Sequence, residues 1–245
     1  MDKNSLRPSF RNIFALGFVS FFTDVSTEMV LSLLPIFIVN LPGSGSAALG
    51  LIEGFAESLS YGMRVVSGVL SDKIKRRKII ILVGYGVSNI VKPFFAIARS
   101  VFEAMAIRIA DRIGKGIRTA PRDALLSESI EEKRRGAAFG LHRTLDQTGA
   151  ILGPLTASFL IYVAGLTIRG IFWISLIPGT AALLILLLFV QEQAAPCRYK
   201  FSMLTGIKET LKGKFLFLLL IVSIFSLGAF NYSFCLLYTS PSPRD

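Results

Sequence analysis

The sequence predicts an all-α fold in the form of a polytopic membrane helix bundle. Hydrophobic residues make up 52% of the 245-residue chain, charged residues make up 18%, and the mean hydropathy is +0.60. These values are too apolar for an ordinary soluble domain. Long apolar runs also alternate with short loops rich in Lys and Arg, which is the pattern of a chain that crosses a bilayer several times.

The apolar runs predict the number of membrane spans. A helix needs about 20 mostly apolar residues to cross the hydrocarbon core of a bilayer. Seven runs reach this length, which indicates a six-helix bundle followed by a seventh helix. The runs cover residues 12–41, 47–71, 79–98, 101–126, 136–165, 169–190 and 215–238.

The domain organisation follows from these runs. We expect a six-helix unit over residues 1–190, a polar and basic linker over 191–214, and one further helix over 215–238. The tail, residues 239–245, contains two prolines and no further span. It is consistent either with a natural external loop that is cut short or with sequence that is not native.

The distribution of Lys and Arg predicts the orientation in the membrane. The loops around residues 71–79, 126–136 and 191–214 are basic, whereas the first loop, residues 41–49, has no charged residue. Cytoplasmic loops carry an excess of Lys and Arg. We therefore expect a multi-pass protein of the cell membrane with its N-terminus in the cytoplasm.

Proline and glycine predict local breaks and close helix contacts. Pro35 predicts a kink in the first run, and Pro42 with the glycines that follow it predicts the end of that run. Pairs of glycines four residues apart provide small faces on which helices pack closely. Such pairs are Gly50 and Gly54, Gly136 and Gly140, and Gly149 and Gly153.

Several classes of function are not expected from the composition. The net charge of +11 does not indicate nucleic-acid binding, because the cations lie largely in the loops between apolar runs. The chain has a single histidine, His142, and two well-separated cysteines, Cys197 and Cys235, so we expect no metal site, no disulfide and no cofactor. We also do not expect an enzyme, because no nucleophile, base and orienting residue can be assembled.

The loop after the second run contains the motif that identifies a family. Its sequence, Gly68-Val-Leu-Ser-Asp72-Lys-Ile-Lys-Arg76-Arg77, resembles the signature of the major facilitator superfamily of transporters. The family usually has a glycine where Lys75 stands. Three other segments together resemble a prokaryotic branch of the superfamily with no assigned substrate: Phe22–Glu28, Gly114–Asp123 and Phe139–Asp146.

Two further segments resemble family motifs. Arg112-Ile-Gly-Lys-Gly116 resembles the fourth-helix motif whose arginine is implicated in proton transfer, with Lys115 in place of the usual glutamine. Gly149-Ala-Ile-Leu-Gly153-Pro154 resembles the fifth-helix motif associated with antiporters, although the following glycine pair is missing. The resemblance thus indicates transport and favours antiport, and the Lys115 departure leaves the coupling ion open.

The resemblance implies an architecture and a gate. The family has twelve helices in two six-helix halves, so this chain would be the N-terminal half with the first helix of the C-terminal half, the rest being missing. It also implies a cytoplasmic latch in which Asp72 and Arg77 meet Asp123 at the end of the fourth helix. The predicted gate residues are Gly68, Asp72, Arg76, Arg77 and Asp123.

Charged residues inside the apolar runs are the candidate transport site. A charge at the centre of a bilayer costs about 2.5–3.5 kcal/mol or more, so each one needs a partner or water. Asp24 and Glu28 lie one turn apart on one helix face. They indicate either a site for a coupling proton or partners for buried arginines. The other candidates for the coupling or substrate cavity are Glu57, Lys92, Arg108, Asp111, Arg112 and Asp146.

These candidates have different expected roles. We expect Asp24, Glu28, Arg112 and Asp146 to converge on one polar cavity, and Asp111 with Arg112 to form a gate or substrate pair. Lys92 is expected to pair with an acid or to contact substrate. His142 is expected to be hydrogen-bonded near the cytoplasmic end, or to relay protons.

The sequence therefore predicts a secondary transporter that moves a small solute by alternating access, with H+ as one candidate for the coupling ion. The bilayer and the missing half are its other partners, and this fragment is not expected to be active alone. A different class of protein, a non-transporting membrane sensor or scaffold, uses the same helices for packing. The charge density of the fourth run argues against that alternative, since a scaffold has no need for it.

Overall fold

The computed structural model describes residues 7–42, 46–74 and 76–192, and a few residues between 216 and 224. The chain divides into two compact units, with the boundary after Ala195. The first unit is described below. The predicted linker, most of the predicted seventh helix and the tail lie outside the described residues, so the predicted domain boundaries stay predictions.

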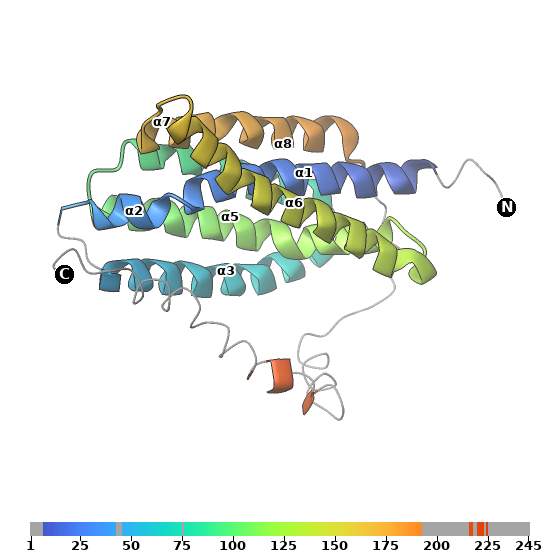
Figure 1. The fold of residues 1–245 in the computed structure, drawn as a ribbon. Helices are drawn as coiled ribbons and strands as arrows, with labels where there is room; N and C mark the ends of the chain where they lie inside the picture. The colour runs from blue at the N-terminus through green and yellow to red at the C-terminus, as the bar shows by residue number, and fades with distance from the viewer. Residues whose placement is uncertain are drawn as a thin grey trace. The chain divides into compact units, whose positions relative to one another are not determined.

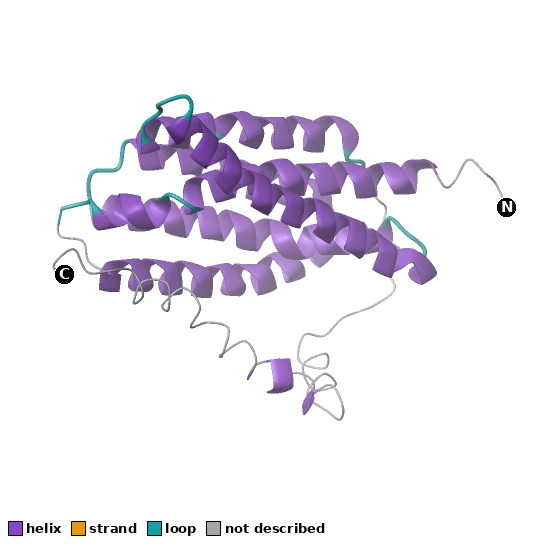
Figure 2. Cartoon of the chain, viewed as in Figure 1, coloured by secondary structure: helices purple, strands orange, loops and turns teal. Residues whose placement is uncertain are grey.

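The described part of the first unit is helical, with no strand among its residues (Figure 2). It contains six segments of membrane-spanning length, and three of them are interrupted. The first is α1 (Arg7–Leu31) with α2 (Leu34–Val39), and the second is α3 (Ser46–Ile74). The third is α4 (Arg77–Val91) with the 3-10 helix η1 (Lys92–Ala96), and the fourth is α5 (Val101–Glu128). After the short 3-10 helix η2 (Glu132–Arg134) come α6 (Arg135–Tyr162), then α7 (Ile168–Ile174) with α8 (Leu176–Phe189). The all-α bundle predicted from the sequence is confirmed.

The interruptions lie where the sequence limits helix geometry. The first span breaks between Leu31 and Leu34, just ahead of Pro35, as predicted. The third span changes to a 3-10 helix at Lys92, where Pro93 follows. The turn between α6 and α7 contains Gly165 with a φ of 64°, a conformation that side chains other than glycine rarely adopt.

The helices pack in a reciprocal pattern. The most extensive contacts of α1 are with α6 and α8, which belong to the fifth and sixth spans. Those of α5 are with α3 and α4, the second and third spans. Spans one to three form one set, and spans four to six form the other. The first helix of each set thus packs against the last two helices of the other set, and α4 also contacts α8. Figure 1 shows α1 and α5 running through the bundle, each with neighbours of the other set beside it. This arrangement makes α1 and α5 the two inner helices.

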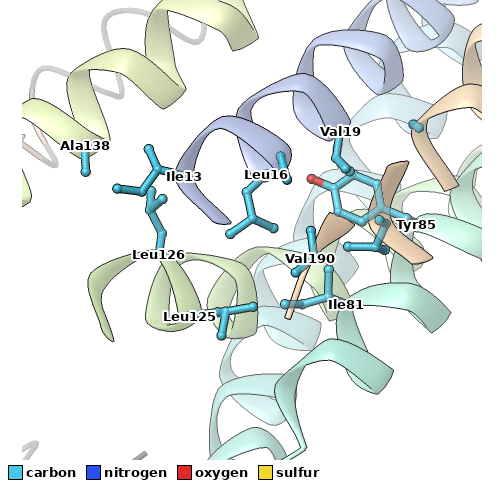
Figure 3. Close-up of a cluster of buried hydrophobic side chains, with 12 residues drawn as sticks. Ile13, Leu16, Val19, Ile81, Tyr85, Leu125, Leu126, Ala138 and Val190 are labelled. Carbon is cyan, nitrogen blue, oxygen red and sulfur yellow. The ribbon is translucent and has the colours of Figure 1, made fainter. Parts of the chain in front are cut away.

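An apolar cluster fills one end of the bundle. Leu16 and Val19 of α1 pack with Tyr85 of α4, Leu125 of α5 and Val190, which directly follows α8 (Figure 3). All five side chains are at most 1% exposed. This end also carries the basic loops at residues 72–78 and 128–135, and we call it the basic end. The cluster ties five spans together there and leaves the polar residues to the middle of the bundle.

Three segments of the described part are long and apolar enough to cross a membrane. They are Arg11–Val39, Arg77–Ala96 and Ile168–Phe189. The fourth span, α5, is a contrasting case because it carries five basic residues between Arg108 and Arg122. Its charged side chains require partners inside the protein, and those partners define the site.

Candidate functional site

The row of charges on α5 is turned into the bundle. Arg108, Asp111, Arg112 and Arg118 are each at most 7% exposed. They recur at intervals of three or four residues, which places them along one helical stripe. The other spans supply the acids and hydroxyls that meet this stripe.

Arg108 is the most completely satisfied of these cations. Its Nε and Nη2 donate to the two carboxylate oxygens of Glu53 on α3, at 2.8 and 2.7 Å. Its Nη1 donates to Asp111 Oδ2 at 3.2 Å, and Ser88 Oγ on α4 donates to Asp111 Oδ1 at 2.5 Å. A bidentate pair of this kind fixes geometry as well as charge. Arg108 and Asp111 are therefore held in a closed network that joins α3, α4 and α5.

Arg112 has a different acid partner from the one expected. The predicted partner, Asp111, is bound to Arg108. Arg112 Nε instead lies 3.3 Å from Glu57 Oε2 on α3. The two predicted members of a gate or substrate pair thus belong to two separate ion pairs. The reason is that Glu53 and Glu57, one turn apart on α3, meet Arg108 and Arg112, one turn apart on α5.

Asp24 and Asp146 form the second centre of the site. Asp24 lies on α1 and Asp146 on α6, and the two acids interact with each other. Asp146 also accepts a hydrogen bond of 2.7 Å from Ser20 Oγ and one of 3.1 Å from Arg143 Nη1. Arg122 on α5 in turn donates to Ser20 Oγ at 3.3 Å. Asp146 is thus well supplied with donors, from Ser20 on α1 and from Arg143 on its own helix.

Two glycines allow α1 and α6 to approach closely enough for this contact. A Cβ on Gly149 would collide with the backbone carbonyl of Phe21, and one on Gly153 would lie 2.7 Å from Glu28 Cβ. The Gly149 and Gly153 pair therefore forms a packing face, as expected. The other predicted faces do not: Gly54, Gly136 and Gly140 have nothing within 4 Å of an added Cβ among the described residues.

Glu28 and Lys92 lie between these two centres. Glu28 interacts electrostatically with Lys115, Arg112, Arg108 and Lys92, and no ion pair joins it to a described residue. Lys92 is 1% exposed, and its Nζ donates to Thr27 Oγ1 at 2.9 Å rather than to a carboxylate. The direct partner of Lys92 is therefore a hydroxyl, not the acid that was expected, and the acids lie further away.

The four residues expected to converge interact in two pairs. Asp24 interacts with Asp146, and Glu28 interacts electrostatically with Arg112. A cavity enclosed by all four side chains stays a prediction. A pocket in the described part lies elsewhere, at the end of the bundle opposite the basic loops, and its lining includes Phe37, Asn40 and Arg169.

The predicted latch has a different acid on α5. Arg77 Nη1 lies 2.8 Å from Glu128 Oε2, and Nη2 lies 3.3 Å from Asp72 Oδ1. Asp123, the predicted partner, pairs with its neighbour Arg122 at 2.9 Å. Arg77 therefore meets an acid more than one turn further along α5 than expected. The reason is that α5 continues to Glu128, which brings this residue level with the start of α4.

The remaining gate residues have separate positions. Gly68 lies on α3 opposite Ala120 of α5, at an ordinary contact distance of 3.5 Å from an added Cβ. Arg76 is exposed and precedes the first residue of α4. Glu192 was not predicted, and its carboxylate accepts hydrogen bonds from the backbone N–H groups of Arg77 and Lys78 at 2.7 and 2.9 Å. The segment after α8 thereby caps the start of α4.

Several residues of the site were not found from the sequence. Ser20, Ser88 and Thr27 are short hydroxyls within apolar runs, and Arg118 is one of several cations on its span with no separate predicted role. The signal for the hydroxyls is weak, because serine and threonine are also tolerated in membrane helices through bonds to their own backbone. His142 is 4% exposed, and its Nε2 has no hydrogen-bond partner among the described residues.

The fold and the site together define a class of protein. Six membrane-spanning segments surround buried charges on their two inner helices, and this arrangement is typical of membrane transport proteins. Residues 16–242 match the family model of the Major Facilitator Superfamily. The chain belongs to this superfamily and is a multi-pass membrane protein of a transporter family that handles small molecules.

Curated relatives agree with this assignment. The chain is 39% identical over 227 residues to an uncharacterized MFS-type transporter of Methanocaldococcus jannaschii, covering 93% of this chain and 56% of the relative. It is 27% identical over 195 residues to Multidrug resistance protein MdtG of Serratia proteamaculans, covering 78% of this chain and 46% of the relative. The chain thus spans about half the length of the curated relatives it matches.

Solved structures show the same fold. A POT family transporter in complex with a thioalcohol-conjugated peptide superposes with a TM-score of 0.68 at 17% identity, covering 88% of this chain and 47% of that one. A bacterial homologue of the human lysosomal transporter Spinster superposes with a TM-score of 0.63 at 21% identity, covering 77% and 46%. At this level of identity the likeness concerns the fold alone.

Proposed function

We propose that the chain is the N-terminal half of a secondary active transporter that exchanges a small solute for protons across the cell membrane. The N-terminus lies in the cytoplasm, and the half described here moves against a second six-helix half. The observation that carries the proposal is that Asp24 and Asp146 interact across two helices that pack closely at Gly149 and Gly153.

The acid pair supports a proton site because two acids on neighbouring helices interact with each other. With both ionised, two negative charges would repel each other in a medium of low dielectric constant. A proton on one acid would remove this repulsion and would let the two carboxyl groups share a hydrogen bond. We therefore expect the pair to bind one proton when the two helices are packed as they are here.

The neighbours of the pair indicate which acid carries the proton. Ser20 and Arg143 both donate to Asp146, which stabilises its ionised form. Asp24 has no comparable pair of donors among the described residues and is the protonated partner. Loss of its proton would place two charges between α1 and α6 and favour a different arrangement of these helices, which joins the proton step to alternating access.

The ion-pair network around Arg108 supports the helix movement that alternating access requires. It joins α3, α4 and α5 through Glu53, Asp111 and Ser88, so these helices move as one body. The reciprocal packing of the two sets of three spans matches the inverted repeats of secondary transporters, whose substrate sites lie near the membrane midplane. The name of the relative from Serratia proteamaculans, a multidrug resistance protein, favours export as the direction of solute movement.

A reconstitution experiment tests the proposal. Full-length protein in proteoliposomes that contain a pH-sensitive dye should release or take up protons when a transported solute is added from a panel of anionic, neutral and cationic compounds. Asp24→Asn should abolish solute accumulation driven by a pH gradient and spare solute exchange, because only the proton step is lost. Glu131→Gln, which changes an exposed acid outside the site, should behave as the wild type.

Two results would contradict the proposal. Accumulation driven by a pH gradient in the Asp24→Asn variant would show that this acid does not carry the coupling proton. Absence of any solute exchange by the wild-type protein across the panel would favour the alternative class, a membrane sensor or scaffold.

A further inference from the structure

Some charged residues inside the bundle of the first unit form no ion pair with a described residue, partly because Arg108 pairs with two acids, Glu53 and Asp111. Within the described spans, Arg108, Arg112, Arg122 and Arg143 each form an ion pair with an acid. Among the residues without an ion pair in this part of the chain, cations outnumber acids. The cations are Arg64, Lys92, Lys115 and Arg118, and the acids are Asp24 and Glu28.

Arg118 is the least satisfied of these cations. It is 4% exposed on α5, and its Nε and Nη1 have no hydrogen-bond partner within the described residues. Its guanidinium lies 4.3 Å from the centre of the Tyr85 ring, so one face of the group is covered. A guanidinium has five N–H donors, and leaving them unpaired away from water is costly. The Tyr85 ring therefore holds in place a buried cation that has at least two unpaired donors.

The neighbours of Arg118 add to the positive potential. Lys115 lies one turn earlier on α5, and Lys92 follows α4; both interact electrostatically with Arg118. Asp24 on α1 interacts with Arg118 and Lys115. The other acids that interact with Lys115 or Lys92 are Glu28, Glu57 and Asp111, and the last two pair with arginines. Close packing holds the cations together, since a Cβ on Gly84 of α4 would lie 2.7 Å from Arg118 Cβ. The repulsion between these fixed cations would be relieved by a bound anion.

We propose that the solute carried by this protein is a small organic anion, and that its carboxylate binds the guanidinium of Arg118 with Lys115 as a second cation. This inference rests on the proposed transport function and names the class of its substrate. The planar fork of an arginine matches a carboxylate with two parallel hydrogen bonds. The Tyr85 ring orients that fork, and Asp24 beside it places the proton site next to the solute.

A binding experiment with matched probes tests the inference. Three compounds of similar shape differ only in charge: 2-naphthoate, its neutral amide 2-naphthamide, and the cation 2-naphthylmethylammonium. Calorimetry on purified full-length protein should show that naphthoate binds most tightly. Arg118→Gln should weaken naphthoate binding at least about tenfold, because a charge-assisted contact is lost. Arg118→Lys should weaken it less, and Arg99→Gln, which removes an exposed cation, should leave it unchanged.

Two outcomes would overturn the inference. One is wild-type protein that binds naphthoate no more tightly than naphthamide, and the other is an Arg118→Gln variant with wild-type affinity for naphthoate. Circular dichroism and retained naphthamide binding distinguish a lost site from a misfolded variant. Proteoliposome exchange of a cationic or neutral solute, without naphthoate binding, would contradict the anion site but not the transport function. Arg118-dependent naphthoate binding without any solute exchange would support the anion site and contradict the transport function.

Discussion

The contact between α1 and α6 can be tested with one substitution at two positions of the same helix. Gly149 and Gly140 both lie on α6. An added Cβ at Gly149 would collide with the backbone carbonyl of Phe21 on α1, whereas one at Gly140 would meet nothing within 4 Å. We predict that Gly149→Ala destabilises the protein and that Gly140→Ala stabilises it.

The magnitude follows from two opposing effects. Replacing glycine by alanine inside a helix favours the helix by about 1 kcal/mol, and this gain applies equally at both positions. At Gly149 it is opposed by overpacking, which costs about 1–3 kcal/mol. A backbone carbonyl cannot rotate away as a side chain can, so α1 itself must shift. The two variants should therefore differ in free energy of unfolding by about 1–3 kcal/mol.

Thermal unfolding of the purified protein in detergent provides the measurement. For a chain of this size, each kcal/mol shifts the midpoint by about 2–4 °C. Gly149→Ala should unfold at a lower temperature than the wild type, and Gly140→Ala at the same or a higher temperature. If Gly149→Ala proves as stable as Gly140→Ala, then α1 and α6 are not packed through Gly149, and the contact between Asp24 and Asp146 loses its support.

Two further predictions concern the basic end and the orientation. Burial raises the pKa of Glu128 above the ordinary 4.5, with Arg77 opposing and Asp72 adding to that rise. As the pH falls, the native state then binds a proton at Glu128 at a higher pH than the unfolded chain does. Lowering the pH from above the raised pKa to 4.5 should therefore raise the unfolding temperature. Glu128→Gln should remove this contribution, and an identical pH profile in both proteins would contradict it. In cysteine-free protein, Arg99→Cys should react with an impermeant thiol reagent from outside the cell and Glu131→Cys only from the cytoplasm; the opposite pattern would reverse the proposed topology.

Hydrophobicity and charge along the chain predicted most of the fold. The six spans of the first unit were expected within a few residues, because the length of an apolar run is a local property that the bilayer thickness dictates. The break ahead of Pro35 followed from the missing proline N–H. Family membership was also predicted, since its motif is a continuous segment between Gly68 and Arg77.

The pairing of charges was predicted poorly. Arg77 does pair with Asp72, as expected, but its partner on α5 is Glu128 rather than Asp123. Arg112 was expected to form a pair with Asp111, and its partner is Glu57. Acids recur on several helices at three- and four-residue spacings, so many pairings are consistent with one sequence. An ion pair needs its atoms within about 4 Å, and a change of one residue in helix register rotates a side chain by about 100°.

The sequence alone determined which residues had to leave the lipid, because burying an unpaired charge in hydrocarbon is costly wherever it lies along a helix. It did not determine which of them would meet. The contact of Asp24 with Asp146 depends on how closely α1 crosses α6 at Gly149. The unpaired guanidinium of Arg118 depends on the nearby acids being bound elsewhere. Both are consequences of packing between helices that are far apart in the chain, so only the tertiary structure decided them.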